Sequence, residues 1–251
     1  AEFAAAIDRV AHAAEMVDRT LEEGDQVTQF EALTAAAYDE FARRGVDIAV
    51  VEAGLGGRWD ATNVIPSEVQ VLTNVGLEHT RWLGPTVRDI AREKLAVVRP
   101  GGTLVLGADL DPDAIAEATD APATRVITAP ADAGVDVGAL GTFQRRNFAL
   151  ARSAAEALLG PLDETSVREA AAAIRVPGRF EVVDHEPLTI IDGAHNPGGM
   201  HALAESLADH REPLVIVLSV LDDKDAAAML SELVPLCDEI VCTSSANPRA
   251  L

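Results

Sequence analysis

The sequence is poor in aromatic residues and in cationic side chains, and each shortage limits what the protein can be. Aromatic residues make up 4% of the 251 residues, so a core must be built mainly from Val, Leu, Ile and Ala, within a hydrophobic fraction of 48%. Lys and Arg number 20 against 41 Asp and Glu, which gives a net charge of −21. Because such a surface repels phosphate groups, we expect neither nucleic acid nor anionic membrane as a partner.

The sequence also lacks the signals of a disulfide framework, a zinc site and a transmembrane helix. The two cysteines, Cys237 and Cys242, are too few for a disulfide framework, and their spacing alone makes no zinc site. No apolar run approaches the length of a transmembrane helix, and no signal peptide is recognisable. We therefore expect a reducing, cytoplasmic location. The chain begins with Ala1 rather than Met and stops just after an expected strand, so we expect an excerpt of a longer protein.

Apolar strands alternate with helices along the chain, which is typical of the α/β fold class. Segments 46–54, 69–76 and 103–108 have the continuous apolar pattern of buried strands. Strands of this kind, separated by helices, predict a parallel sheet covered on both faces. The alternation restarts near residue 180, so we predict two α/β domains, 1–179 and 180–251.

Local signals set the limits of one helix and one loop. Thr28, followed three residues later by Glu31, predicts a capping box at the start of a helix that Gly45 ends. Segment 128–141 is rich in Ala, Gly and Pro and has no hydrophobic period, so we expect a loop there.

Polar residues follow the ends of several expected strands. In an open α/β sheet, ligands bind beyond the carboxyl ends of the strands. Taken singly, a histidine after a strand is more often structural, and a lysine on a helix usually faces solvent. The residues at these positions are Glu78, His79, Asp192, His195 and Asn196, with Lys94 on an intervening helix.

The stretch AVVEAGLGGRWDATNVI, residues 49–65, combines an apolar run, an acid and three glycines. The glycines would suit a phosphate cradle, a flat ring or a simple turn. A phosphate cradle is disfavoured because no Lys-Ser/Thr follows the glycines and because Glu52 would repel phosphate. A dinucleotide fold is disfavoured too, since the run is not G-x-G-x-x-G and no helix is expected to begin after it.

Five stretches in order resemble a known family. They are LTAAAYDEFARRGVDIAVVEAGLGGRWDATNVI, LTNVGLEHTRWLGPTVRDIAREKLAVVRPG, GTFQRRN, PGRFEVV and IIDGAHNPGG. In content and approximate spacing they resemble the folylpolyglutamate synthase/dihydrofolate synthase family, a branch of the ATP-dependent Mur-type ligases. The resemblance covers nearly the whole chain. It implies a parallel-sheet central (ATPase) domain followed by a smaller Rossmann-like domain.

The resemblance implies an amide-forming ligase that joins an amino acid, usually glutamate, to a carboxylate through an acyl phosphate made from ATP. It implies two Mg²⁺ sites, with Glu31 in FEALT at one and His79 in GLEHTRWLG at the other. Lys94 in AREKLAV matches a lysine that is often carbamylated, and a carbamate offers the oxygen ligands that Mg²⁺ prefers. These three residues are also the expected catalytic set, since the metals would neutralise charge on the transferred phosphate.

Further contacts are implied for the nucleotide and the amino acid. Arg179, in PGRFE, resembles an arginine that reaches the ATP phosphates, and Asp192 resembles an acid at the ribose. Lys224 resembles a residue near the carboxylate of the incoming amino acid, with a plain surface charge as the alternative. Arg145 and Arg146 are expected to face solvent. The complete expected nucleotide set is Gln144, Asn147, Arg179, Asp192 and His195.

The resemblance makes the 49–65 stretch a loop on the folate side. Asp60 could pair with an exocyclic amine and a neighbouring N–H of a pteridine, so its loss should weaken folate binding more than ATP binding. Folate or dihydropteroate, L-glutamate and ATP are the expected small-molecule partners of a monomer. The expected substrate contacts in the loop are Arg58, Asp60, Ala61 and Asn63.

One feature of the resembling family is missing. No G-x-x-x-x-G-K-[ST] phosphate loop occurs in residues 1–251, so we expect this segment alone to bind ATP poorly and to lack ligase activity. An excerpt of an active ligase, a non-catalytic folate-binding remnant or scaffold, and a chain complemented by another all fit this observation. A Mur-type ligase of cell-wall synthesis is a further alternative, which the phrase GLGGRWDATN disfavours.

Overall fold

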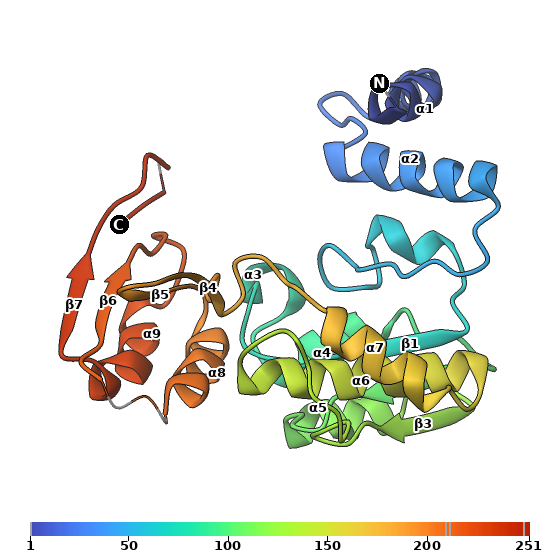
Figure 1. Ribbon diagram of the computed structural model, residues 1–251. Helices are drawn as coiled ribbons and strands as arrows, with labels where there is room; N and C mark the ends of the chain where they lie inside the picture. Colours follow the sequence, from blue (N-terminus) through green and yellow to red (C-terminus); the bar gives the residue numbers. More distant parts are fainter. Residues whose placement is uncertain (1, 209, 211, 248) are drawn as a thin grey trace.

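The computed structural model describes residues 2–208, 210, 212–247 and 249–251, and its main body is a parallel sheet between helices (Figure 1). The strands lie in the order β1 (Val69–Leu72), β2 (Thr103–Leu106) and β3 (Arg125–Thr128), and both pairings are parallel. This confirms the predicted α/β class, although the strands are shorter than expected. No helix in the described ranges is long and apolar enough to cross a membrane.

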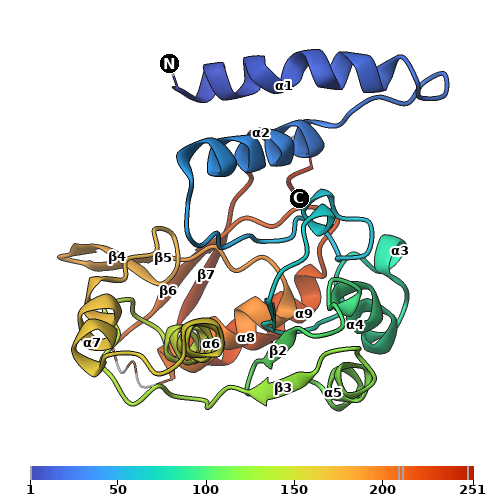
Figure 2. The ribbon, with the colours of Figure 1, turned by 90° about the vertical axis from the view of Figure 1, so that its right-hand side faces the viewer.

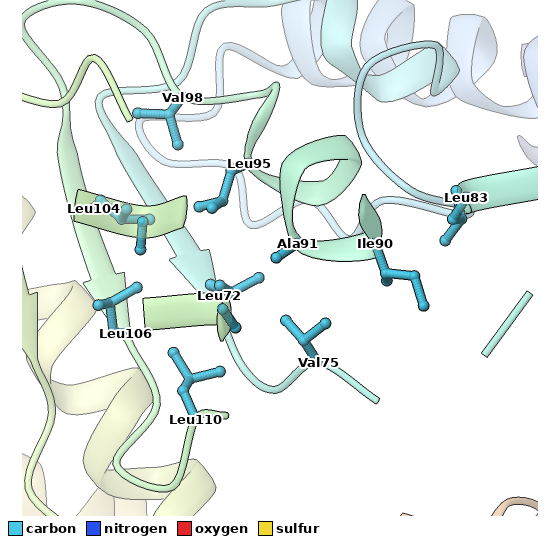
Figure 3. Packing of buried hydrophobic residues seen from close by; sticks show 12 residues of the cluster. Leu72, Val75, Leu83, Ile90, Ala91, Leu95, Val98, Leu104, Leu106 and Leu110 are labelled. Carbon is cyan, nitrogen blue, oxygen red and sulfur yellow. The ribbon is translucent and has the colours of Figure 1, made fainter. Parts of the chain in front are cut away.

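The core divides into two layers because successive side chains of a strand point to opposite faces. On β2, Leu104 and Leu106 join the cluster that packs under α4 (Val87–Leu95) and α5 (Pro112–Thr119), as Figure 3 shows. Val105 lies between them in sequence and packs on the other face against Leu150 of α6 (Thr142–Leu159). Burial on both faces explains the apolar run of β2, whereas Val71 of β1 and Val126 of β3 are exposed.

A third helix layer lies outside α6. Phe148 of α6 packs against Val167 and Ala171 of α7 (Glu164–Ala173). The segment from the end of β3 to the start of α6 contains neither helix nor strand, which confirms the loop predicted for 128–141.

The C-terminal part contains a hairpin and a small parallel sheet. Strands β4 (Glu181–His185) and β5 (Leu188–Ile191) pair antiparallel, and β6 (Val215–Leu218) and β7 (Glu239–Cys242) pair in parallel. The buried side chains Met200, Met229 and Leu233 pack beneath β6. Residue 179 as the boundary between two domains stays a prediction. The helical elements of this part are α8 (Pro197–Leu207), α9 (Ala226–Leu233) and η2 (Val234–Leu236).

The first two helices form a layer of their own above the body (Figures 1 and 2). Helix α1 (Glu2–Asp18) packs on α2 (Gln29–Arg44), with Arg9 paired to both Asp39 and Glu40. The capping box at the start of α2 and the left-handed Gly45 at its end (φ 59°) are both present, as predicted.

The prediction of a strand at residues 46–54 is wrong. This segment has no regular secondary structure, and the side chains of Val46, Ile48 and Val50 are exposed, Val50 to 95%. An apolar run becomes a strand only where a neighbour supplies hydrogen bonds and cover. Within the described residues β1 pairs only with β2, and no strand lies against residues 46–54. The remaining short elements are η1 (Ala61–Val64) and α3 (Thr80–Leu83).

Candidate functional site

The three glycines after residue 53 each lie against a different helix. A Cβ on Gly54 would lie 2.5 Å from the ring of Phe30 in α2, and one on Gly56 would lie 2.8 Å from Cδ2 of Leu83 in α3. A Cβ on Gly57 would meet backbone oxygens of α4, that of Lys94 at 2.7 Å and that of Glu93 at 2.9 Å. Of these three glycines only Gly56 has a positive φ, 66°. At Gly54 and Gly57 the missing side chain instead allows the loop backbone to lie close to the neighbouring helix.

Asp60 holds this loop together from inside. Its Oδ2 accepts hydrogen bonds from the amides of Gly54 (2.9 Å) and Leu55 (2.8 Å). Its Oδ1 accepts from the amide (3.0 Å) and the hydroxyl (2.5 Å) of Thr62. A carboxylate has about four lone-pair sites, so Asp60 is saturated by the protein. The residue is only 9% exposed.

The ionisation of Asp60 follows from these contacts. Burial alone would raise its pKa, but the hydrogen bonds from Thr62, Leu55 and Gly54 outweigh burial and lower the pKa below its ordinary value. Asp60 is therefore a charged anchor of the loop. The pteridine contact expected for Asp60 stays a prediction, and a ligand donor would have to replace one of the bonds now present.

The other expected substrate residues of the loop are also held by the fold. Arg58 pairs with Glu93 of α4, Nε to Oε1 at 2.9 Å, and its amide donates to the Glu93 carbonyl. Asn63 donates to the Arg58 carbonyl and accepts from Arg99 at 2.8 Å. Ala61 begins η1 and is half-buried. The four substrate residues expected between 58 and 63 thus lie in one loop clamped on α4.

Trp59 projects from this loop and was missed by the sequence reasoning. Its side chain is 89% exposed although both neighbours, Arg58 and Asp60, are bonded to the protein. Trp82, beside the Leu83 that the loop approaches, is exposed as well and lies under the guanidinium of Arg81 at 5.2 Å. The signal available in the sequence was that these are the chain's two tryptophans.

The three residues expected at Mg²⁺ do not assemble a metal site as they stand. Glu31 is engaged in the capping box, where its Oε2 accepts from the amide and the hydroxyl of Thr28, and these bonds lower its pKa. His79 precedes α3 in a left-handed conformation, φ 52°, and Lys94 lies in the last turn of α4. Among the described residues no three His, Cys, Asp or Glu side chains form a group that could hold a metal. The donor set does not fit Mg²⁺ without carbamylation of Lys94, which stays a prediction.

Helix α6 carries the residues expected nearest the nucleotide. Gln144 is buried and its Oε1 accepts weakly from Asn147 Nδ2 at 3.4 Å. Arg145 makes a loose pair with Asp132 at 3.6 Å. Arg146, which was expected to face solvent, is half-buried and pairs with Glu205 of α8 at 2.6 Å.

The linker between body and C-terminal part is fixed by a carboxylate. Asp192 accepts from the amide of Phe180 at 2.8 Å and from that of Ala194 at 2.7 Å. Phe180 has a positive φ of 48°, which a bulky residue adopts only when its surroundings impose it. The Arg179 side chain lies over Gly193, where a Cβ would be 1.8 Å from Nη1. Asp192 therefore shapes the linker, and its contact with a ribose stays a prediction.

The strand-end loop after β1 meets the start of α8. Asn196 caps α8 by accepting from the amide of Gly199, and its Nδ2 donates to Glu78. His195 Nε2 lies 3.9 Å from the same Glu78 carboxylate. His79 and His195 are therefore carried by loops in contact. Lys224 instead pairs with the adjacent Asp223, Nζ to Oδ2 at 3.4 Å.

Comparison with known proteins agrees with this architecture. Residues 178–251 match the family described as Mur ligase, glutamate ligase domain. The dihydrofolate synthase/folylpolyglutamate synthase of Mycobacterium tuberculosis is 37% identical over 268 residues, which cover 91% of this chain and 55% of that protein. The apo form of L. casei folylpolyglutamate synthase has a TM-score of 0.81 at 31% identity, covering 99% of this chain and 67% of that one.

A complex of folylpolyglutamate synthase with AMPPCP and folate is similar as well, with a TM-score of 0.83 at 32% identity over 94% of this chain and 65% of that one. The α/β body and the matched glutamate ligase domain define a Mur-type ligase. Within that class, the chain belongs to the folylpolyglutamate synthase/dihydrofolate synthase family, as the five motifs predicted. It spans little more than half the length of the M. tuberculosis relative.

Proposed function

We propose that this chain acts in an ATP-dependent ligase that adds L-glutamate to folate through an acyl phosphate, with dihydropteroate as a second acceptor. In this proposal residues 1–179 are the central ATPase domain and residues 180–251 the glutamate ligase domain of a cytoplasmic monomer. ATP is the co-substrate. The acceptor carboxylate attacks the γ-phosphate of ATP and forms an acyl phosphate as the bond to ADP breaks, and the amine of glutamate then displaces inorganic phosphate to form the amide.

The clamped glycine loop is the observation that carries the proposal. It holds Arg58, Asp60, Ala61 and Asn63 in one rigid unit and rests on the backbone of α4 beside Lys94. A rigid loop next to a candidate reactive residue is what orientation of a substrate requires. The exposed ring of Trp59 at the edge of the loop adds a flat apolar surface suited to stacking against an aromatic ligand such as a pteridine.

The residues of this chain supply positioning in the proposed reaction. His195 and Asn196 lie beside Glu78 of the loop after β1, and Arg179 lies in the linker over Gly193. The guanidinium of Arg179 and the amide of Asn196 suit phosphate oxygens. Mg²⁺ would stabilise charge on the transferred phosphate, but the described side chains do not assemble its site.

An incorporation assay on the full-length protein tests the proposal. The protein is incubated with ATP, radiolabelled glutamate and either tetrahydrofolate or dihydropteroate, and the products are separated by chromatography. We expect ATP-dependent label in a folate lengthened by one glutamate. Label in dihydrofolate from the dihydropteroate arm would show the second activity.

The same mixture separates the proposal from a non-catalytic folate-binding protein, which the lack of a G-x-x-x-x-G-K-[ST] run in residues 1–251 keeps as the second candidate. Folate binding by calorimetry without any ATP-dependent incorporation would support that second candidate and contradict the ligase.

A further inference from the structure

Helix α6 begins without a cap of its own. The residue at its N-cap position is Gly141, with φ 97° and no side chain to accept a hydrogen bond from the first turn. The first amides of a helix have no partner within the helix and need an acceptor from elsewhere. This matters here because Gln144 lies in that first turn and Asn147 one turn later.

Ser206 of α8 supplies the missing acceptor. The Thr142 amide donates to Ser206 Oγ at 3.1 Å, although 64 residues separate the two in sequence. The Ser206 hydroxyl donates its own proton to the Ala202 carbonyl at 2.9 Å, which orients a lone pair toward α6. The Thr142 hydroxyl lies 3.3 Å from the same oxygen. A helix of the C-terminal part therefore caps a helix of the body.

Arg146, one turn after Thr142, makes a second connection to the same place. Its Nη2 lies 2.6 Å from Oε2 of Glu205, the residue before Ser206, and its Nε lies 3.4 Å from Asp109 after β2. The side chain is about two-thirds covered, at 31% exposure. One guanidinium thus joins the carboxylates of two elements, the loop after β2 and helix α8.

We propose that Arg146 and Ser206 are positioning residues, which dock α8 on α6 and so hold the first two turns of α6 in place. Gln144 lies in the first turn, where Ser206 accepts from the Thr142 amide, and Asn147 lies in the next turn, beside the Arg146 that pairs with Glu205. The effect on nucleotide rests on the proposed function: docking of the C-terminal part would tighten the α6 turn expected beside ATP.

The ion pair is tested by reversing its charges in the full-length protein. R146E and E205R should each weaken the contact, and the double variant R146E/E205R should restore the pair between positions 146 and 205 with opposite polarity. The pair of Arg146 with Asp109 is lost in R146E and in the double variant alike, so recovery is measured against R146E. The readouts are limited proteolysis in the linker 175–180 and the KM for ATP. We expect each single variant to raise the KM for ATP about fivefold with little change in kcat, and the double variant to have a lower KM than R146E.

Arg145→Glu is the matched control, because it makes the same charge change one residue away, where the partner is Asp132. It should leave the KM and the linker cleavage unchanged. Additive effects of R146E and E205R, with no recovery in the double variant, would overturn the proposal. If the double variant recovers the cleavage rate but no variant has ligase activity, the proposed function is refuted. The docking of α8 on α6 would still be supported.

The cap is tested by hydrogen exchange of the α6 amides in Ser206→Ala. We expect exchange of the Thr142 amide and its neighbours to speed up about tenfold, since a capping hydrogen bond is lost. Ser153→Ala is the matched control, because the Ser153 hydroxyl also donates to a carbonyl four residues back but caps nothing. Equal exchange in both variants would contradict a cap supplied by α8.

Discussion

Replacing Gly57 by alanine is expected to cut ligase activity about a hundredfold and to destabilise the protein by about 3 kcal/mol. The new Cβ would lie 2.7 Å from the Lys94 carbonyl oxygen and 2.9 Å from that of Glu93, and both are backbone atoms of α4. Neither oxygen can rotate away as a side chain can, so the loop must lift off the helix. The measurements are steady-state kinetics and urea unfolding of the full-length variant.

Gly76→Ala is the control for this prediction. Gly76 follows β1, has no positive φ, and has no atom within 4 Å of an added Cβ. Its substitution should leave stability and activity nearly unchanged. If Gly57→Ala behaves like Gly76→Ala, then the loop does not rest on α4 in solution.

Asp60→Asn is expected to cost about 3 kcal/mol of stability and to weaken folate and ATP turnover together. An amide group offers one acceptor oxygen and one donor nitrogen, whereas Asp60 accepts on both sides from Gly54, Leu55 and Thr62. In either orientation of the asparagine amide, its NH₂ group would face backbone N–H groups that now donate to Asp60, and the site is buried. Equal losses would count against the sequence-based expectation that loss of Asp60 weakens folate binding more than ATP binding.

The pH dependence gives a second readout for Asp60. Because its folded pKa is lowered, the charged Asp60 contributes stability above its unfolded pKa of about 3.9, and this contribution is lost as pH falls through the folded pKa. The difference in unfolding free energy between wild type and Asp60→Asn should therefore shrink below about pH 4.

Asp111→Asn is the control for the Asp60 substitution, since Asp111 is an exposed N-cap with one amide partner and asparagine caps equally well. A variant Asp60→Asn as stable as Asp111→Asn would show that the loop does not depend on the carboxylate.

Local signals in the sequence were sufficient for much of the fold. The capping box of Thr28 and Glu31, the stop at Gly45 and the apolar β2 depend on neighbours in the chain or on simple burial, and the structure has all three. The strand expected at 46–54 has the same apolar pattern as β2, but it has no hydrogen-bonding neighbour among the described residues. An apolar pattern indicates that a segment is suited to a sheet, but whether a neighbouring strand is present to bond with it depends on the three-dimensional fold.

The site residues expected from the sequence stay predictions, but the structure shows some of their contacts. The substrate residues expected at 58–63 lie in one loop held on α4, the loops of His79 and His195 meet through Glu78, and Lys224 pairs with Asp223. The carboxylates of Asp60 and Asp192 were expected at ligands, yet both are occupied by backbone amides. Residue type alone cannot separate these roles, because an acid suited to a ligand N–H is equally suited to a protein N–H.

The most direct test of the proposed ligase follows one oxygen atom. A reduced folate with ¹⁸O in its terminal carboxylate is incubated with ATP, glutamate and the full-length protein, and the released phosphate is analysed by mass spectrometry. The proposal predicts one labelled oxygen per phosphate, because the carboxylate oxygen that attacks ATP leaves with phosphorus when the glutamate amine forms the amide. Release of phosphate without label, in step with formation of the lengthened folate, would contradict it.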